Sequence, residues 1–192
     1  MKEKNTDHSI VAAENLKDSI FFENVSQSYL DEIASTAIIM KAEKDDVIYT
    51  AGEENSAGIF LLLSGLVKLF RKGEDTTLDS TEDIVEGETF NSLSLFYEKK
   101  RGETATASAY SQLLFIPKQA LLDLCHTQPE FNKILHDKTT LQFNRNKLRR
   151  ILLHFYSDEV DQSILRKIML TGEWITLKHN SKLFDEDEPS DS

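Results

Sequence analysis

Residues 45–70 read DDVIYTAGEENSAGIFLLLSGLVKLF, a series of short apolar runs separated by glycine-containing turns. The pattern continues in EGETFNSLSL (86–95) and in ETATASAYSQLLFIP (103–117). Six of the seven glycines lie between residues 52 and 102, and glycine readily adopts the positive φ that tight turns need. The apolar runs are rich in β-branched and aromatic residues, which favour strands. This stretch therefore predicts a β domain of many short strands.

Both flanks of the β region read as helical. Residues 15–37 carry apolar side chains at roughly helical intervals, namely Leu16, Ile20, Val25, Leu30 and Ile33. After the β region, KQALLDLCH (118–126) reads as a short amphipathic helix. The next residues, TQPE (127–130), have the pattern of a capping box with proline in the first turn. A long helix is therefore predicted over residues 127–156.

The long helix carries an apolar stripe. Positions 131, 134, 138, 141, 145, 148, 152 and 155 alternate in steps of three and four, and six of the eight are apolar. A stripe of this kind needs a partner to cover it. One interpretation is packing against the helix's own β domain. The other is the seam of a homodimer through the 131–155 helix, or a spacer between domains.

Composition limits the classes of partner. The chain has 192 residues and a formal net charge of −11, and a negative field repels nucleic-acid phosphates. Its single cysteine, Cys125, can form no internal disulfide, which favours a reducing, cytoplasmic setting. The N-terminus lacks the apolar core of a signal peptide, and residues 59–70 are too short and too interrupted to span a bilayer. We expect neither a membrane nor a nucleic acid as partner.

The sequence shows no pattern of catalytic or metal-binding residues. It contains no phosphate loop, no HExxH and no GxSxG motif, and its five histidines show no metal-ligand spacing. Cys125 is interpreted as a buried structural cysteine rather than a reactive partner of His126, because adjacent helical residues point about 100° apart. The basic cluster RNKLRR (145–150) is interpreted as the wet face of the long helix, and the alternative is a contact with DNA or with an acidic surface of a partner. We therefore predict that the protein is not an enzyme.

Residues 20–135 resemble the cyclic-nucleotide-binding domain family, which includes bacterial catabolite activators and eukaryotic regulatory subunits and channels. The resemblance rests on the three stretches quoted above, in particular on the glycine spacing, Phe90, Ala105-Thr106 and the closing Ile116-Pro117. It implies a mainly β fold with flanking helices. The expected architecture is an antiparallel jelly-roll β-roll (double-stranded β-helix) of about eight strands, followed by a long C-terminal helix.

The family holds its nucleotide in a phosphate-binding cassette, usually Phe-Gly-Glu-x-Ala-Leu followed later by Arg-x-Ala-Thr. The resemblance implies that the arginine clamps the cyclic phosphate, that backbone N–H groups approach its oxygens, and that the glutamate accepts a hydrogen bond from the ribose. In this chain the cassette reads Phe90-Asn91-Ser92-Leu93-Ser94-Leu95, followed by Glu103-Thr104-Ala105-Thr106. The glycine has become Asn91, the ribose glutamate Ser92 and the phosphate arginine Glu103.

Glu103 puts a carboxylate where relatives hold a cation. Two like charges ~4 Å apart cost about 4 kcal/mol at an effective dielectric near 20. Arg101 would share a face with Glu103 on one strand, and could then reach the pocket or pair with Glu103; the alternative is a solvated loop arginine. Thr104 and Thr106 offer hydroxyl groups to an uncharged ligand. The candidate ligand-pocket residues are Phe90, Asn91, Ser92, Leu93, Arg101, Glu103, Thr104 and Thr106.

The C-terminal tail resembles the start of the chain at an offset of 135 (165 − 30 = 135). Matching pairs include Leu30 with Leu165, Ile33 with Ile168, Ile48 with Leu183 and Glu53 with Glu188. We therefore divide the chain into a polar N-terminal segment (1–19), the β-roll with its flanking helices (20–126), the long helix (127–156) and the start of a second, truncated repeat (157–192). The last ten or so residues are expected to be loosely held, because a severed strand cannot bury itself.

The leading functional hypothesis is a non-catalytic regulatory or sensor module with a degenerate cassette. We expect it to bind cyclic AMP or cyclic GMP weakly or not at all, and we expect no cofactor; its ligand is a cyclic nucleotide or another small molecule. One alternative is a transcription regulator of the catabolite-activator type, although residues 157–192 do not supply a convincing helix-turn-helix. Another is the regulatory arm of a larger enzyme, such as a patatin-like lipid hydrolase, whose reading frame would continue past Ser192.

Overall fold

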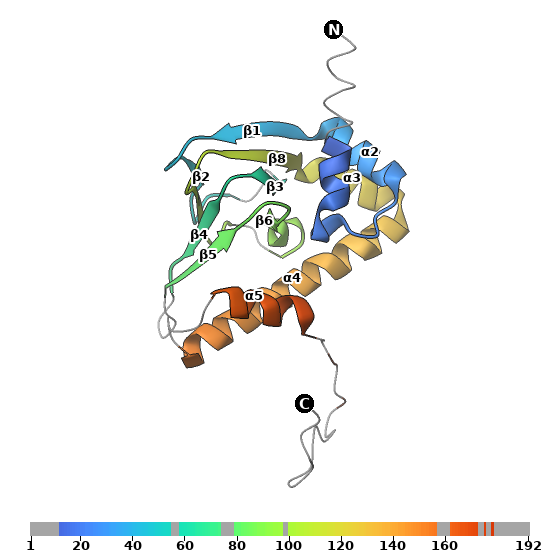
Figure 1. Ribbon diagram of the computed structural model, residues 1–192. Helices are drawn as coiled ribbons and strands as arrows, with labels where there is room; N and C mark the ends of the chain where they lie inside the picture. Colours follow the sequence, from blue (N-terminus) through green and yellow to red (C-terminus); the bar gives the residue numbers. More distant parts are fainter. Residues whose placement is uncertain are drawn as a thin grey trace.

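The computed structural model describes residues 12–54, 58–73, 79–97, 100–156, 162–172, 175 and 178. Among them, eight strands form two four-stranded antiparallel sheets, with the orders β1-β8-β3-β6 and β2-β7-β4-β5. The strands are β1 (Ile38–Ala42), β2 (Val47–Tyr49), β3 (Gly58–Ser64), β4 (Val67–Arg71), β5 (Ser80–Ile84), β6 (Thr89–Phe90), β7 (Thr104–Ala107) and β8 (Ser111–Pro117). The antiparallel β-roll followed by a long helix is confirmed (Figure 1).

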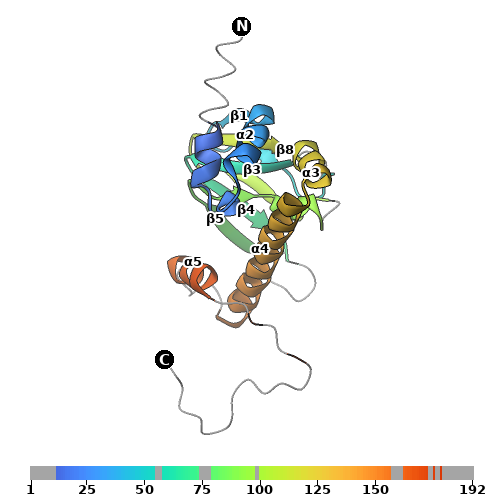
Figure 2. The same ribbon diagram turned by 90° about the vertical axis from the view of Figure 1, so that its right-hand side faces the viewer.

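Helices cover one end and one side of the roll. Residues 12–18 are helical, and the 3-10 turn η1 (Ile20–Phe22) and the helix α2 (Gln27–Thr36) precede β1. The helices after β8 are α3 (Lys118–Thr127), α4 (Pro129–Tyr156) and α5 (Gln162–Thr171). Figures 1 and 2 show the first helices, α2 and α3 grouped at one end of the sheets, with α4 running from that end along the roll. None of the described helices is both long enough and apolar enough to cross a membrane.

The hydrophobic core has two parts on opposite faces of the sheet that contains β3. One part fills the interior of the roll, where the rings of Phe60 and Phe90 stack with their centroids 5.1 Å apart. The other part packs Ile59 and Leu61 against the helices. The first five residues of β3 are therefore buried, although strand side chains alternate between faces. This burial on both faces explains the unbroken apolar run in that part of the sequence.

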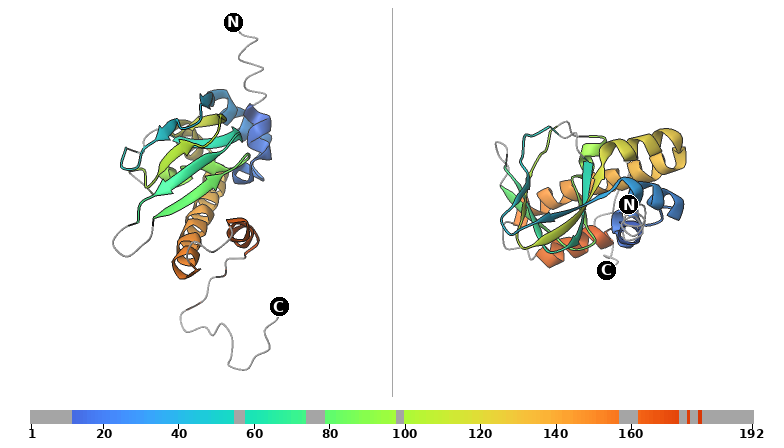
Figure 3. Two further views of the ribbon diagram at one scale, coloured as in Figure 1. Left: turned by 60° about the vertical axis from the view of Figure 1, so that its left-hand side comes forward. Right: turned by 90° about the horizontal axis from the view of Figure 1, so that it is seen from above.

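Alternation along β4 and β7 decides which side chains enter the roll. In β7, Ala105 and Ala107 are buried, whereas Thr104 and Thr106 lie on the other face. β4 pairs with β7 in an antiparallel register that ends with Phe70 opposite Thr104. Arg71 and Glu103 are the next residues along this register, so they come opposite each other. Figure 3 shows α4 running past β5, the neighbour of β4, and Arg149 of α4 donates a hydrogen bond to the carbonyl oxygen of Thr81 in β5.

Ala12, Ala13 and Leu16, which precede the domain start predicted at residue 20, form one buried helical face within the core. One expectation about local structure is corrected. Thr127 does not cap the long helix. Its hydroxyl donates to the carbonyl oxygens of Asp123 and Leu124 at the end of α3 (3.1 and 3.2 Å). α4 begins at Pro129 itself, where a missing N–H costs nothing in the first turn.

The helix α4 packs against the chain's own domain, with Phe131, Leu135 and Thr139 buried. Of these, only Phe131 belongs to the predicted stripe, and positions 134, 138, 141, 145, 148 and 152 of the stripe are half-buried. The homodimer seam stays a prediction. Of the second repeat expected after residue 157, the structure describes α5 and residues 172, 175 and 178. α5 contacts α4, as Figure 1 also shows. The strands and turns expected beyond it, and the last ten residues, lie outside the described residues.

Candidate functional site

The cassette turn keeps a tight backbone although its glycine is replaced. Asn91 joins β6 to the short 3-10 helix η2 (Ser92–Leu95) with φ 63° and ψ 19°. This left-handed conformation is adopted by asparagine more readily than by most residues. The Asn91 side chain donates from Nδ2 to the carbonyl oxygen of Gly58 at 2.7 Å. Gly58 in turn leaves no room for a side chain, because a Cβ there would overlap the carbonyl oxygen of Ile116.

Glu103 is held by two groups. Its Oε2 lies 2.7 Å from Nη2 of Arg71, and its Oε1 accepts a hydrogen bond from the Tyr49 hydroxyl at 3.2 Å. The side chains of Arg71 and Glu103 are only 24% and 14% exposed. Burial, and next the charge of Glu103, raises the pKa of Tyr49, which therefore stays a neutral donor. Arg71, rather than the Arg101 considered from the sequence, supplies the counter-ion of Glu103.

A second ion pair lies beside the first. Glu82 of β5 stands opposite Leu69 of β4, and its Oε1 is 3.7 Å from Nη1 of Arg149. Arg149 comes from α4, is buried, and donates from Nη2 to the carbonyl oxygen of Thr81 at 2.7 Å. Burial raises the pKa of Glu82, and the nearby Arg149 opposes this shift. The expectation that residues 145–150 form the wet face of the helix is therefore wrong for Arg149.

The two pairs and α4 leave little free space at the cassette. A cavity of ≈ 20 Å³ there is lined by Phe90, Asn91, Ser92, Leu93, Arg71, Glu103 and further residues that include Gln142 and Asn146 of α4. A single water molecule needs roughly 10–15 Å³, so the cavity holds about one. In this arrangement of α4, side chains of α4 form part of the cavity wall at the cassette.

Arg101 is buried rather than solvated, so the loop-arginine alternative is wrong. It is 7% exposed, and its guanidinium carbon lies 3.9 Å from the centroid of the Tyr49 ring. Its Nε is 4.0 Å from Oε2 of Glu53, and its backbone N–H donates to the Glu53 carbonyl oxygen at 2.9 Å. Glu103, its other expected partner, is held by Arg71 instead.

The structure brings five of the eight candidate residues to one cavity, namely Phe90, Asn91, Ser92, Leu93 and Glu103. Thr104 and Thr106 lie on the opposite face of β7 from the buried alanines, and Oγ1 of Thr104 accepts the Ala51 N–H at 3.1 Å. The sequence reasoning missed Arg71, Glu82, Gln142, Asn146 and Arg149. For Arg71, alternation along Val67, Leu69 and Arg71 was the available signal, but the partner strand and its register were unknown.

Residues 39–128 match the family described as Cyclic nucleotide-binding domain. A cyclic nucleotide-binding domain from Methylobacillus flagellatus KT has a similar fold, with 16% identity and a TM-score of 0.61 over 81% of this chain and 86% of that chain. So does the regulatory domain of Toxoplasma gondii PKA, solved with cAMP (12% identity, TM-score 0.62, 77% of this chain and 52% of that chain).

A third similar structure is the sensor domain of the transcriptional regulator DNR from Pseudomonas aeruginosa, with 23% identity and a TM-score of 0.52 over 80% of this chain and 95% of that chain. Comparison with curated protein sequences finds no match. The β-roll, residues 39–128, thus matches the cyclic nucleotide-binding domain family.

Proposed function

We propose that this chain is a non-catalytic regulatory module whose cassette binds cyclic AMP or cyclic GMP weakly or not at all. The observation that carries the proposal is the Arg71–Glu103 pair, 2.7 Å apart beside the cassette. An entering cyclic phosphate would need a cation, and the guanidinium of Arg71 is already neutralised by a carboxylate of its own chain. The nucleotide would also have to displace α4 side chains from a cavity of ≈ 20 Å³.

The cost of opening the pair supports weak binding. A phosphate that took Arg71 as its partner would leave the Glu103 carboxylate unpaired beside a second negative charge. Removing one partner from a buried ion pair costs about 3–5 kcal/mol, and we take the lower end because Arg71 is partly exposed. Since ~1.4 kcal/mol is a factor of ten, a loss of ~3 kcal/mol would weaken a site of about 10 μM to about 1 mM.

We infer that α4 is the element through which the module acts. It is tied to the roll by Arg149 on Thr81 and to the N-terminal turn by Lys138, whose Nζ donates to the Ile20 carbonyl oxygen at 3.1 Å. A ligand that favours one position of α4 over another would change what α4 presents to a partner. The regulatory and sensor domains among the similar structures support a regulatory role rather than a catalytic one.

Thermal unfolding with and without nucleotide tests the proposal. We expect cyclic AMP or cyclic GMP at about 1 mM to leave the melting temperature unchanged. A site with a Kd of about 10 μM would stabilise the folded state by ~2.7 kcal/mol, which raises the melting temperature by roughly 5–10 °C for a chain of this size. Calorimetric uptake of one equivalent of either nucleotide would refute the proposal.

A rescue variant provides the positive control for the missing clamp. Ser92→Glu combined with Glu103→Arg restores both family side chains, and Arg71 then lies beside a second cation instead of a carboxylate. We expect measurable binding of cyclic AMP by this double variant and none by Ser92→Glu alone. Failure of the double variant to bind would show that the position of α4, rather than the Arg71–Glu103 pair, closes the cassette.

A tandem arrangement is a second proposal, supported by the helix α5. Both bounds of α5 lie 135 residues after those of α2 (162 − 27 = 171 − 36 = 135). Ile33 of α2 is 1% exposed in the core, whereas its counterpart Ile168 is 41% exposed. We infer that α5 begins a second unit whose own roll would cover Ile168, as in the regulatory arm of a larger protein. A stop codon directly after Ser192 would contradict this inference.

A further inference from the structure

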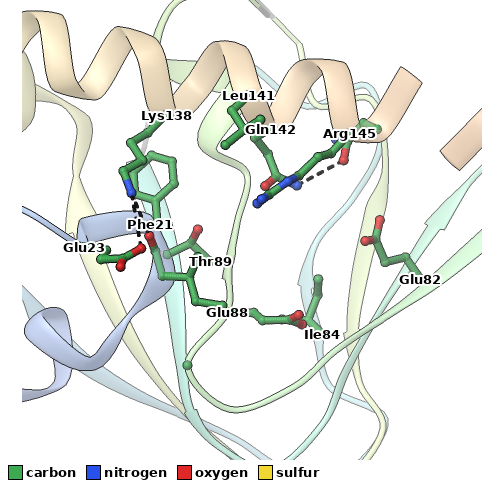
Figure 4. A pocket seen from close by; sticks show the side chains of 13 residues that line it. Phe21, Glu23, Glu82, Ile84, Glu88, Thr89, Lys138, Leu141, Gln142 and Arg145 are labelled. Atoms are coloured by element: carbon green, nitrogen blue, oxygen red, sulfur yellow. Dashed lines mark hydrogen bonds and ion pairs between the residues drawn. The ribbon is translucent and has the colours of Figure 1, made fainter. Parts of the chain in front are cut away.

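A roomier cavity lies beside the closed cassette. It has a volume of ≈ 160 Å³ and lies between the N-terminal turn η1 with Glu23, the end of β5 with the turn into β6, and α4 (Figure 4). It extends away from Glu103, toward Phe21 and Lys138, and shares five lining residues with the cassette cavity: Glu82, Ile84, Thr89, Gln142 and Asn146. An apolar cavity of about 150 Å³ is large enough for a benzene-sized ligand.

Part of the wall of this cavity is apolar. Ile20 and Phe21 come from the N-terminal turn, Ile84 from β5 and Leu141 from α4. These four side chains lie on all three sides, so a hydrocarbon group between them would lose contact with water. The shape of the cavity therefore suits a ligand with a compact apolar body.

Lys138, one of the two cations in the wall, is already engaged. Its Nζ donates to the carbonyl oxygen of Ile20 at 3.1 Å and lies 4.0 Å from Oε2 of Glu23 (Figure 4). Lys138 and Glu23 therefore largely cancel each other at one end of the cavity. This end joins α4 to the N-terminal turn.

The two other carboxylates in the wall also have partners. Glu82 is 3.7 Å from Nη1 of Arg149, which lies outside the cavity wall. Oε2 of Glu88 accepts the Val85 N–H at 3.0 Å. A cationic ligand would therefore have to compete for carboxylates that the chain itself already uses.

Arg145 differs from these groups. Its Nε is buried without a hydrogen bond, and Arg145 forms no ion pair with any carboxylate of the described residues. Burial lowers the pKa of Arg145, as happens when no neighbouring anion offsets the loss of water. Figure 4 shows its side chain directed from α4 into the cavity beside Gln142. Arg145 is thus a charge in the wall that lacks a counter-ion.

We propose that this cavity is a binding site for a small molecule with one anionic head group, such as a carboxylate, and an apolar body of about the size of a benzene ring. The head group pairs with Arg145, because charge-assisted bonds from a guanidinium to a carboxylate are strong and directional. The body packs between Ile84, Phe21 and Leu141. The effect of this ligand rests on the proposed regulatory function. The ligand would join α4 to the roll and to the N-terminal turn, and so bias the position of α4.

Three probes with the same ring and different charge test the site on the whole chain: benzoate, benzamide and benzylamine. Isothermal titration calorimetry and ligand-observed NMR report their binding. We expect benzoate to bind at least tenfold more tightly than benzamide, and benzylamine to bind more weakly still. Benzylamine that binds as tightly as benzoate, or benzoate that does not bind at millimolar concentration, overturns the proposal.

Variants of α4 locate the binding. Arg145→Met should weaken benzoate binding at least tenfold, whereas the matched variant Lys147→Met should not, because Lys147 is exposed two residues further along the same helix. Leu141→Trp fills the cavity and should abolish binding while Arg145 is intact. Benzoate binding that survives both Arg145→Met and Leu141→Trp overturns the proposal. Should Arg145→Met fail to fold by circular dichroism, Leu141→Trp and the charge series decide the question.

The same titrations separate this proposal from the proposed function. Uptake of cyclic AMP that benzoate does not displace would refute the closed cassette and leave the benzoate result standing. If neither benzoate nor cyclic AMP binds, the new site is refuted and the proposed function stands.

Discussion

Replacing Glu103 by glutamine tests the ion pair on which the proposed function depends. Glutamine has nearly the same shape, and its side-chain oxygen can still accept the hydrogen bond that the Tyr49 hydroxyl donates at 3.2 Å. What it lacks is the negative charge 2.7 Å from Arg71. We expect a loss of stability, because Arg71 then keeps a largely buried charge without a counter-ion.

The magnitude follows from the geometry and exposure of the pair. Two unit charges ~4 Å apart attract each other by about 4 kcal/mol at an effective dielectric near 20. Arg71 is 24% exposed and can turn partly toward water, so we expect a loss of only about 2–3 kcal/mol in the free energy of unfolding. With a urea m-value of roughly 2 kcal/mol per molar, the unfolding midpoint falls by about 1–1.5 M.

Urea unfolding at neutral pH, followed by circular dichroism, measures this shift. Glu86→Gln is the matched control, because Glu86 is an exposed carboxylate and exposed changes usually stay within about 0.5 kcal/mol. In a double-mutant cycle, Arg71→Met and Glu103→Gln should couple by about 1–3 kcal/mol. A midpoint shift no larger than that of Glu86→Gln, or a coupling energy near zero, would refute the reasoning.

Other predictions address the second ion pair, the core and the helix α4. Burial raises the pKa of Glu82 above its ordinary value of 4.5, so the stability that this group contributes is complete below pH 4.5 and is lost as the pH rises through the raised pKa. Urea unfolding from about pH 4 to pH 8 should show this fall in the free energy of unfolding, and Glu82→Gln should reduce it. A pH dependence that is the same in the variant would contradict the prediction. Cys125 is buried and burial raises the pKa of its thiol, so Ellman's reagent should modify it at least ~100-fold more slowly in the folded chain than in urea; similar rates would argue against its burial. Gly58→Ala should lower the free energy of unfolding by more than ~2 kcal/mol, because φ of Gly58 is +152° and a Cβ there would overlap the carbonyl oxygen of Ile116. An unchanged urea midpoint would rule out this steric conflict. If the chain forms a homodimer through α4, replacement of the exposed Phe143 by Glu should shift it to monomer in sedimentation; a wild-type chain that is already monomeric would end that proposal.

Much of the fold could be predicted because its signals are local. The runs around Val47, Ile59 and Leu113 became strands through their β-branched and apolar residues, and glycines marked the turns between them. The strand β1 (Ile38–Ala42) was not predicted, because it follows directly on α2 with a single residue between them. Thr127 likewise fits the capping-box pattern, but its hydroxyl donates to the carbonyl oxygen of Asp123 in the preceding helix α3 instead.

The sequence predicted where the candidate site lies and which cassette residues are replaced, but not which residues of the chain pair with them. The cassette alignment located Phe90 to Leu93 and Glu103, which do line one cavity. It left three places open for Arg101, namely the pocket, a pair with Glu103, or solvent. The structure buries Arg101 against Tyr49. The reason is that residues 101–103 precede β7 instead of continuing it, so strand alternation does not extend from Glu103 to Arg101.

The sequence by itself determined the β-roll, the long helix and a cassette that carries Asn91, Ser92 and Glu103 in place of the family's glycine, glutamate and arginine. Only the tertiary structure decided that Arg71 neutralises Glu103, and that a cavity of ≈ 160 Å³ lies beside the cassette. The physical reason is the range of the interactions. Strand and turn preferences act over a few residues, whereas 32 positions separate Arg71 from Glu103 and 68 separate Arg149 from Thr81, so strand register and helix packing decide those contacts.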